Sequence, residues 1–333
     1  MRTFFTIALL LIPASAFGEI TSFPIKPSAT DPAIKTFDDP HWLYVNRGIV
    51  VERKPELPKD RHQLLLWLTG TGGKGQTAMG FSNLAADLGY HVVTLMFPDD
   101  VPATTCATDA DPKAFENFRM AIIAGGKARS HGGTKDFPIE RAESIESRLI
   151  KLLEHLKTIR PAEHWEQFLN DDGTIKWESI TVAGQSQGGG HAALIGIRHK
   201  VARVIAFGAP KDYSKKLDAP AAWYAHESAT PKNRFYAFNH HQDPKGCTPE
   251  QLLKNLKALG LDAFGAVAEV DTEAAPFHHS HVLYTGFPNV TIDGPESDGA
   301  KAAHTSGIST KNAERWKPVW TYLLTDEGER EAK

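Results

Sequence analysis

The residue type and spacing that point most directly to chemistry are those around Ser186, at the centre of Gly184-Gln-Ser-Gln-Gly188. A serine hydroxyl is a weak nucleophile, and it needs an adjacent base that can take its proton. It must also stand clear of the strand before it, which forces the serine into a strained backbone conformation. The positions two before and two after the serine must then be small, and Gly184 and Gly188 meet that demand. The pattern predicts an exposed serine that could perform acyl transfer.

The residues on either side of this turn predict the elements that would hold the serine. Ile180–Ala183 is a short β-branched run typical of a strand, and a helix is expected after Gly184–Gly188 and through Ile197. The helix N-terminus would direct its partial positive charge at Ser186, where negative charge develops during acyl transfer. A five-residue pattern is common by chance, so the strand and helix patterns carry much of this prediction.

This strand, serine turn and helix resemble the nucleophile elbow of the α/β-hydrolase superfamily, and of secreted serine esterases and lipases within it. The triad order in that superfamily is serine, acid, histidine. The resemblance implies Asp243 as the acid, just after the apolar run Arg234–Phe238, and His304 as the base. His304 follows a Gly- and Asp-rich stretch, 293–303, which we expect to be a loop. Asp243 would orient the imidazole, which would take the proton of Ser186.

Both partners of the serine have competitors in the sequence. Asp212 is an alternative acid, because some related enzymes place the acid one strand earlier. Three histidines before or at the start of a later predicted strand are alternative bases: His278, His279 and His281. We predict Asp243 and His304, and we keep these alternatives open.

The superfamily's oxyanion hole uses two backbone N–H groups. One belongs to the residue after the nucleophile, here Gln187. The other belongs to a loop after an earlier strand, and Gly70–Gly73 resembles that loop except that Thr69 stands where lipases and esterases have a histidine. Aligning the loops gives Thr71 as the donor, with Gly72 as the alternative. The same loop lacks the Gly-Lys-Ser/Thr ending of a P-loop, so we predict no nucleotide site.

Apolar runs of strand length alternate with helical patterns through most of the chain. His62–Thr69 and Tyr90–Phe97 are typical of strands buried on both faces, and a helix over 77–88 joins them. Such short connections argue for a parallel sheet. Further strands are expected at 48–53, 202–207, 234–238, 266–270 and 281–285, and further helices at 141–159, 249–259 and 313–324. Together with the resemblance, this predicts an α/β-hydrolase fold with a mostly parallel sheet of about eight strands and helices on both faces.

Two stretches lack a clear period. Residues 19–45 read as an extended lead-in. Residues 98–137 are irregular, with a helical piece near 115–123, and an insert of this length could form part of a substrate wall or lid. We see no repeat and no linker, and therefore predict one domain over 19–333.

The N-terminus carries a targeting signal. Arg2 is followed by the apolar run Phe4–Ile12 and by small residues up to Gly18. This is the pattern of a secretory signal peptide over residues 1–18, cleaved after Ala16 or at its end. The apolar run is too short to span a membrane. We expect a secreted or periplasmic protein without stable membrane anchoring.

Composition adds bounds but no activity. The 333 residues are 41% hydrophobic and 23% charged, which is ordinary for a soluble globular protein. A net charge of −3 gives no reason to expect nucleic acid as a partner. The chain has two cysteines, Cys106 and Cys247. In an exported protein such a pair predicts a disulfide, with two buried thiols as the alternative.

The resemblance implies a serine hydrolase that needs no cofactor and cleaves a small-molecule or polymer-linked carboxylic ester. A peptidase or amidase on the same fold is the alternative. A metal-dependent hydrolase is a further one, because His240, His241 and Asp243 lie close together in the sequence, but their spacing is unlike that of known zinc sites. A catalytically inactive binding protein is the last. Five aromatic residues could line a substrate pocket, although most aromatics belong to the core: Phe97, Phe115, Phe118, Trp223 and Phe277.

Overall fold

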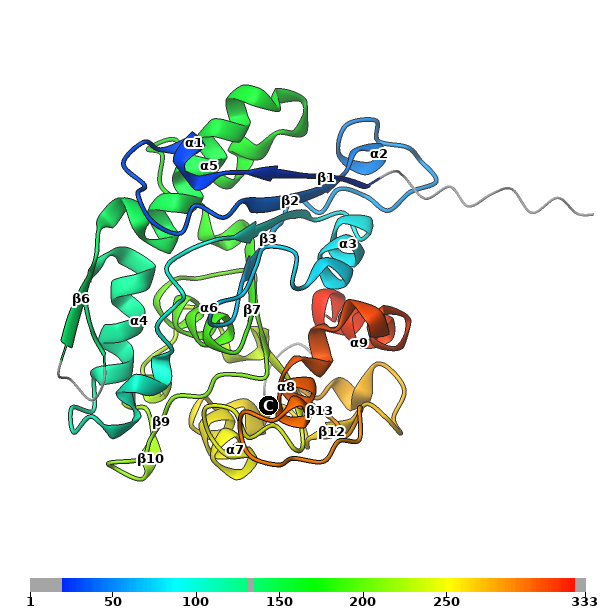
Figure 1. The fold of residues 1–333 in the computed structure, drawn as a ribbon. Coiled ribbons are helices and arrows are strands. Elements are labelled where there is room, and N and C mark those ends of the chain that lie inside the picture. The colour runs from blue at the N-terminus through cyan, green and yellow to red at the C-terminus, as the bar shows by residue number, and fades with distance from the viewer. Residues whose placement is uncertain (1–19, 131–134, 327–333) are drawn as a thin grey trace, which may run out of the picture.

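The computed structural model describes residues 20–130 and 135–326, so the predicted signal peptide, residues 1–18, lies outside the described residues. A nine-stranded sheet with the order β1-β2-β4-β3-β7-β8-β11-β13-β12 runs through the molecule (Figure 1). Its strands are β1 (Ile20–Ile25), β2 (His41–Asn46), β3 (Leu64–Leu68), β4 (His91–Leu95), β7 (Ile180–Gln185), β8 (Arg203–Phe207), β11 (Phe235–His240), β12 (Ala268–Glu269) and β13 (Val282–Thr285). All pairs from β4 to β12 in this order are parallel, whereas the β1–β2 and β2–β4 pairs are antiparallel. The predicted mostly parallel sheet is confirmed.

Helices cover both faces of this sheet, as predicted. Figure 1 shows α3 (Met79–Asp87) and α9 (Ala313–Thr325) on one side, and α4 (Ala114–Ala124), α5 (Ile145–Ile159) and α6 (Gln187–Arg198) on the other. Two further helices, α7 (Pro249–Ala258) and α8 (Asp298–Thr305), lie near β12 and β13 in Figure 1. The sheet therefore separates two hydrophobic cores.

The continuous apolar run of β3 follows from this layering, because alternate side chains enter opposite cores. Leu66 belongs to the core on the α4–α6 side. Trp67 belongs to the other, where its ring centroid lies 5.4 Å from that of Phe81 and 5.5 Å from that of Phe207. A strand with both faces covered thus needs no polar face, and the strand prediction for this run is confirmed.

Three predictions about local structure are wrong. The expected strand at 48–53 is the short helix α2 (Arg47–Val50), and the lead-in over 19–45 contains β1 and most of β2. The irregular stretch contains a hairpin of β5 (Gly126–Ser130) and β6 (Lys135–Ile139), which pair only with each other. β1 lies at the edge of the sheet, and β1, β5 and β6 have polar residues at many positions, so the periodicity of a buried strand does not reveal them. β2 is a buried interior strand, but its apolar run, Trp42–Val45, is short.

The expected loop before His304 is also partly wrong. Helix α8 begins after Ser297, whose hydroxyl accepts a hydrogen bond from the Ala300 N–H at 3.2 Å. His304 lies in the last turn of this helix. The glycine and aspartate of the segment suggested a loop, but Ser297 is a good N-cap and the alanines that follow favour a helix.

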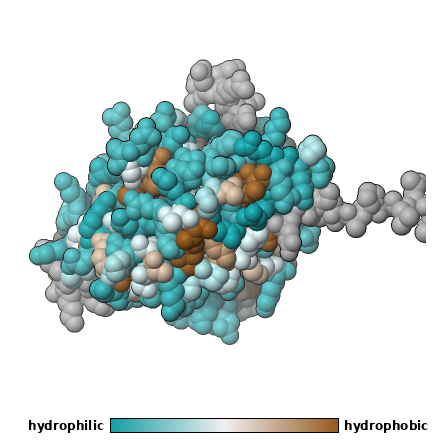
Figure 2. Space-filling view, turned by 90° about the horizontal axis from the view of Figure 1, so that it is seen from above, coloured by the Kyte–Doolittle hydropathy of each residue, from teal (hydrophilic) through white to brown (hydrophobic). Residues whose placement is uncertain are grey.

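The face of the molecule seen from above has no large hydrophobic patch. Figure 2 shows a mainly hydrophilic face with hydrophobic residues in small separate patches. The exposed large hydrophobic side chains of the described residues lie on different segments: Met79, Ile159, Leu217, Leu253 and Val267. Over the same residues, no helix combines the length and the apolar character needed to cross a bilayer.

Candidate active site

Ser186 is the single residue between β7 and α6, so the turn is tighter than the predicted span of 184–188. Its backbone is strained, with φ 54° and ψ −116°. The Ser186 N–H donates to the Phe207 carbonyl at 2.9 Å, and the Ser186 carbonyl accepts from the Gly190 N–H at 3.1 Å. These bonds hold the serine between a central strand and a helix N-terminus.

The glycines around the serine are required by close backbone contacts. A Cβ on Gly184 would lie 2.4 Å from the carbonyl carbon of Gly188, and a Cβ on Gly188 would lie 2.1 Å from the Leu68 oxygen. Atoms that are not bonded to each other do not approach so closely, so both positions exclude any side chain. The predicted demand for small residues is confirmed.

His304 and Asp243 are in direct contact. His304 Nδ1 and Asp243 Oδ2 are 2.8 Å apart, and the two side chains are only 11% and 1% exposed. Asp243 lies in the loop after β11, and His304 comes from α8. The side-chain amide of Gln185, the residue before the serine, donates to the His304 carbonyl at 3.1 Å. The histidine is therefore fastened to the serine turn as well as to the carboxylate.

Ser186 and His304 line the same cavity, of about 520 Å³. The described residues show no hydrogen bond between the two side chains, and such bonds are often long in unliganded enzymes. Part of the wall comes from the stretch after β4, as expected for an insert at 98–137: Pro102, Ala103, Thr104 and Arg119. The cavity thus places a strained serine and a carboxylate-bound imidazole on one surface.

Thr71 and Gln187 also line the cavity, and their side chains are linked. The Thr71 hydroxyl donates to Gln187 Oε1 at 3.1 Å, and the Ala103 N–H donates to the same oxygen at 2.8 Å. The Gly72 N–H donates to the Asp99 carbonyl at 3.1 Å, so it is already used. Within the described residues, the Thr71 and Gln187 N–H groups make no hydrogen bond. This favours Thr71 over Gly72 as the second donor.

Asp99 accepts hydrogen bonds from two residues of this loop, Thr69 and Gly72. The Thr69 hydroxyl donates to Asp99 Oδ2 at 3.0 Å. Burial raises the pKa of the Asp99 carboxyl to about 6. The threonine that stands where lipases and esterases have a histidine therefore anchors the loop to a buried acid.

The alternative acid, Asp212, has other partners. Arg119 Nε and Nη2 each donate to its carboxylate at 2.6 Å, and the Trp223 indole N–H donates at 2.9 Å. Arg119 also donates through Nη1 to the Gln187 carbonyl at 2.9 Å, and a Cβ on Gly190 would collide with its guanidinium. The structure brings Asp243, and not Asp212, to His304.

Sequence reasoning missed Lys211 as well as Arg119. Lys211 Nζ lies 2.5 Å from Asp243 Oδ2 and 2.6 Å from the Lys245 carbonyl oxygen, and its side chain is 7% exposed. Its position directly before Asp212, after a predicted strand, was the only signal for it in the sequence. That signal is weak because the direction of a loop side chain has no period.

The surroundings of Asp243 and His304 lower the pKa of both groups. Burial alone would raise the pKa of Asp243, but the hydrogen bond from His304 and the charge of Lys211 hold it at about 2. Burial lowers the pKa of His304, and the charges of Lys211 and Lys245 add to this, against the raising effect of Asp243. The site thus pairs an ionised carboxylate with an imidazole that is neutral at pH 7, as a base must be.

The histidines that were alternative bases or candidate metal ligands contact other residues. His240 Nε2 bonds the Pro288 carbonyl at 3.1 Å, and His241 Nε2 lies 2.7 Å from Glu269. His279 Nδ1 lies 2.9 Å from Asp326, His278 Nε2 lies 3.5 Å from Glu273, and His281 is buried between aromatic rings. In the part of the chain that the structure describes, no group of three or more His, Cys, Asp or Glu residues could hold a metal ion.

Two further predictions are corrected. The five aromatic candidates for a pocket lining are all core residues and do not line the cavity: Phe97, Phe115, Phe118, Trp223 and Phe277. Cys106 and Cys247 are free and buried, so the predicted disulfide is not formed. The Cys106 thiol donates a hydrogen bond to the Ala114 carbonyl, with Sγ 3.6 Å from the oxygen. Burial raises the pKa of both thiols to about 12.

A mostly parallel sheet in which a strained serine joins a central strand to a helix defines the α/β-hydrolase fold, and this chain has that fold. No family model matches the sequence, and no curated protein matches it. Among solved structures, esterase B from Lactobacillus rhamnosis is similar, with a TM-score of 0.44 and 13% identity over 94% of this chain and 88% of that chain.

Two further solved structures are similar at the same level. Esterase B inhibited by a tributyrin phosphonate has a TM-score of 0.42 and 12% identity over 92% of this chain and 86% of that chain. A candidate carboxylesterase from Lactobacillus plantarum WCFS1 has a TM-score of 0.38 and 12% identity over 92% of this chain and all of that chain.

Proposed function

We propose that this protein is a serine hydrolase that cleaves carboxylic esters through an acyl-enzyme, with Ser186, His304 and Asp243 as its triad. One observation carries the proposal: a serine at φ 54° shares a cavity with an imidazole whose Nδ1 is 2.8 Å from a buried carboxylate. A nucleophile, a base and a group that orients the base are the parts that acyl transfer requires.

In the acylation step, Ser186 Oγ bonds the ester carbonyl carbon while its proton passes to His304. The carbonyl oxygen becomes an oxyanion, which the N–H groups of Thr71 and Gln187 would bind at the N-terminus of α6. The carbon–oxygen bond to the alcohol then breaks, and His304 returns the proton to the departing alcohol. Asp243 stays ionised and stabilises the imidazolium that forms in between.

Water completes the cycle. His304 takes a proton from a water molecule whose oxygen bonds the acyl carbon, and the bond to Ser186 Oγ breaks as the serine regains a proton. The net change is ester plus water to acid plus alcohol, and the proposed steps use only Ser186, His304, Asp243 and backbone N–H groups. Amide or peptide hydrolysis would use the same groups, and a panel of matched esters and amides separates the two reactions.

Residues 1–18 make export part of the proposal: the mature protein would be one hydrolase domain from residue 19, secreted or periplasmic. N-terminal sequencing of the protein recovered outside the cytoplasm tests this. A chain that still begins at Met1 there would contradict the cleavage.

The test of the catalytic proposal is intact mass after treatment with a fluorophosphonate, which modifies activated serines. We expect a single adduct on the wild type and none on Ser186→Ala. Ser82→Ala is the matched control, because Ser82 is buried in α3 and its hydroxyl has no partner among the described residues. It should react like the wild type. A wild type that forms no adduct would favour a binding protein without turnover.

A further inference from the structure

Asp243 receives an ammonium group as well as an imidazole. Lys211 Nζ, from the loop after β8, lies 2.5 Å from Asp243 Oδ2, the oxygen to which His304 Nδ1 is bonded at 2.8 Å. The backbone N–H of Lys245 donates to Asp243 Oδ1 at 3.0 Å, and the Lys245 carbonyl accepts from Lys211 at 2.6 Å. Two side chains therefore donate to the same carboxylate oxygen.

This sharing changes the charge of the site. An isolated Asp–His pair has charge −1 at rest and becomes neutral when the histidine is protonated. With Lys211 included, the group is neutral at rest and carries +1 with imidazolium present. Lys211 and Asp243 are only 7% and 1% exposed, so solvent screens them little. The lysine thus opposes protonation of His304.

Other charged groups line the cavity of His304. Arg119 and Asp212 are buried but are paired with each other at 2.6 Å, and the rest are more exposed. Lys245 and Glu296 form a pair 2.9 Å apart at the cavity, with the two side chains 20% and 84% exposed. On α8 itself, Lys301 and Asp298 are 3.5 Å apart and largely exposed. Pairs in solvent interact weakly with their surroundings. Lys211 is therefore the buried cation that contacts the carboxylate bonded to His304.

We propose that Lys211 is a positioning residue that holds the Asp243 carboxylate and keeps the His304 imidazole uncharged, and hence able to act, in mildly acidic solution. The inference rests on the proposed function, because it needs His304 to be the base. The lowered pKa of His304, which follows from burial and then from the balance of Asp243 against Lys211 and Lys245, agrees in direction.

The sign of the expected effect follows directly. A base works only while it is neutral, so the acid limb of kcat/KM reports the pKa of the free enzyme's base. Removing the Lys211 charge takes away an interaction that disfavours imidazolium, so the pKa of His304 rises. On acidification, the variant therefore loses activity at a higher pH than the wild type does. A nearby charge typically shifts a pKa by about one unit or more.

The first experiment compares pH profiles of kcat/KM for the wild type, Lys211→Met, Lys211→Arg and Lys257→Met. Lys211→Met should move the acid limb up by about one pH unit. Below that limb its activity should be about tenfold lower than that of the wild type. Lys211→Arg should restore the wild-type limb, and Lys257→Met, which removes an exposed lysine from α7, should leave it unchanged. A folded Lys211→Met protein with the wild-type limb would overturn the inference.

The second experiment reads the imidazole directly by NMR of histidine-labelled protein, with the His304 signal identified by its loss in His304→Ala. The wild-type midpoint should lie below about 6.5, the ordinary value for histidine, and should rise in Lys211→Met. If that variant does not fold, Lys211→Gln replaces it, because it is neutral but keeps a donor. A wild-type midpoint at or above 6.5 would overturn the inference on its own.

The two proposals fail in different ways. The NMR midpoint needs no turnover, so a low midpoint in a protein that never reacts with fluorophosphonate would reject the proposed function. A protein that reacts at Ser186, but whose His304 midpoint is the same with and without Lys211, would reject only the role of the lysine.

Discussion

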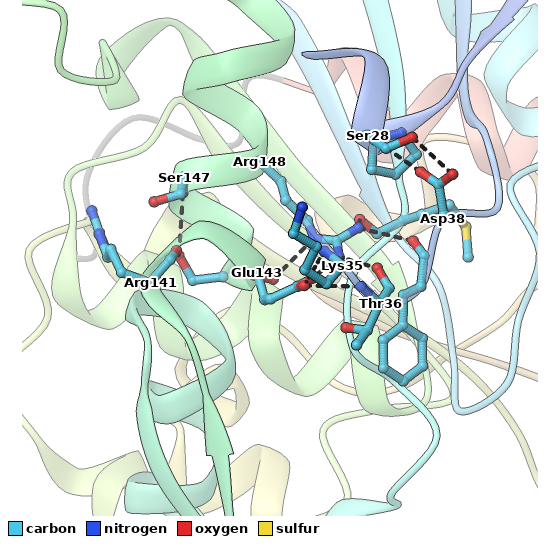
Figure 3. A network of polar contacts seen from close by, with 12 residues as sticks. Ser28, Lys35, Thr36, Asp38, Arg141, Glu143, Ser147 and Arg148 are labelled. Carbon is cyan, nitrogen blue, oxygen red and sulfur yellow. Dashed lines mark hydrogen bonds and ion pairs between the residues drawn. The ribbon is translucent and has the colours of Figure 1, made fainter. Parts of the chain in front are cut away.

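The Arg148–Glu143 and Lys211–Asp243 pairs are both buried, yet their partners are of different kinds. Arg148, on α5, donates to the Thr36 carbonyl at 2.7 Å and also contacts the Glu143 carboxylate. Glu143 in turn accepts the Thr36 N–H at 2.9 Å. Figure 3 shows these side chains pointing at the segment between β1 and β2. The side chains of this first pair thus hold the backbone of the segment between β1 and β2.

The second pair contacts a titratable side chain instead. Asp243 accepts from Lys211 and from His304, and His304 lines the cavity. Any change in the charge of this pair is therefore felt by the imidazole, whereas the backbone partners of Arg148 cannot titrate. Removing one member of a buried pair leaves an uncompensated charge in both cases. The comparison indicates that the partners of a buried ion pair, and not its burial, distinguish a structural pair from one that can tune a reaction.

The largest expected effect is on the histidine that this second pair contacts. His304→Ala should lower kcat/KM by a factor of about 10⁴ to 10⁶, because loss of the base alone costs nearly as much as loss of a whole triad. Its midpoint of thermal unfolding should fall, because Asp243 loses a hydrogen-bond donor, so both proteins are assayed at a temperature where they are folded. His279→Ala, which removes a histidine that contacts Asp326 outside the cavity, is the matched control and should keep its activity. A His304→Ala protein with more than a tenth of wild-type activity would exclude this histidine as the base.

Substitutions at Asp243 and Asp212 should have clearly different effects on turnover. Asp243→Asn keeps the shape of the side chain but disturbs the tautomer of His304, and it should lower kcat by about 10⁴. Asp212→Asn should keep much more of the turnover, because Asp212 contacts Arg119 and Trp223 and not His304. Its cost should appear as lower stability, since Arg119 is left buried with a neutral partner. Kinetics and urea unfolding on both variants check this, and collapse of activity in Asp212→Asn alone would reverse the assignment.

These contacts show which parts of the molecule could be predicted from the sequence. The strands and the turn at Ser186 have local signals, because a strand buried on both faces is a continuous apolar run and the turn needs glycines at fixed offsets. Asp243 and His304 were proposed from chain order, by resemblance, and the structure places them in contact. Their catalytic roles remain proposals.

The parts that were missed depend on contacts between distant segments. Lys211 and Asp243 are 32 residues apart, and Arg119 and Asp212 are 93 apart, so no local period relates them. Such pairs depend on where two loops lie at the end of the sheet. Helix α8 was missed for another reason: one capping serine outweighed a composition typical of loops.

The first pair can be tested by its effect on stability. Arg148→Met should lower the free energy of unfolding by about 3 to 5 kcal/mol, because Glu143 is left as a buried unpaired charge. The kcat of the protein that is folded should not change, since neither residue lines the cavity. Urea unfolding measures the first quantity, and kinetics normalised to fluorophosphonate-reactive protein measure the second.

A matched control lies on the same helix. Lys151 and Glu154 form a pair 2.8 Å apart with side chains 43% and 46% exposed. Exposed pairs contribute about 0 to 1 kcal/mol, so Lys151→Met should change stability far less than Arg148→Met. Equal losses in the two variants would show that burial of the Arg148 pair has no special weight. A loss of kcat in Arg148→Met would show that the two regions are coupled.

The smallest expected effect is on the free energy of unfolding at low pH, which depends on the ionisation of Asp243 in the second pair. The pKa of Asp243 is about 2 in the folded protein and about 3.9 in an unfolded chain, so the group stabilises the fold above pH 4. That contribution, about 2 to 3 kcal/mol from the difference between the two values, is lost as the pH falls through 2. Asp243→Asn should therefore lose less stability than the wild type between pH 5 and pH 2 in urea unfolding. Lys211→Met should lie between them, because without the lysine the pKa of Asp243 rises toward its unfolded value. If all three proteins lost the same stability over this range, the carboxylate would not be held ionised by its neighbours, and the contrast with Arg148 and Glu143 would lose its electrostatic basis.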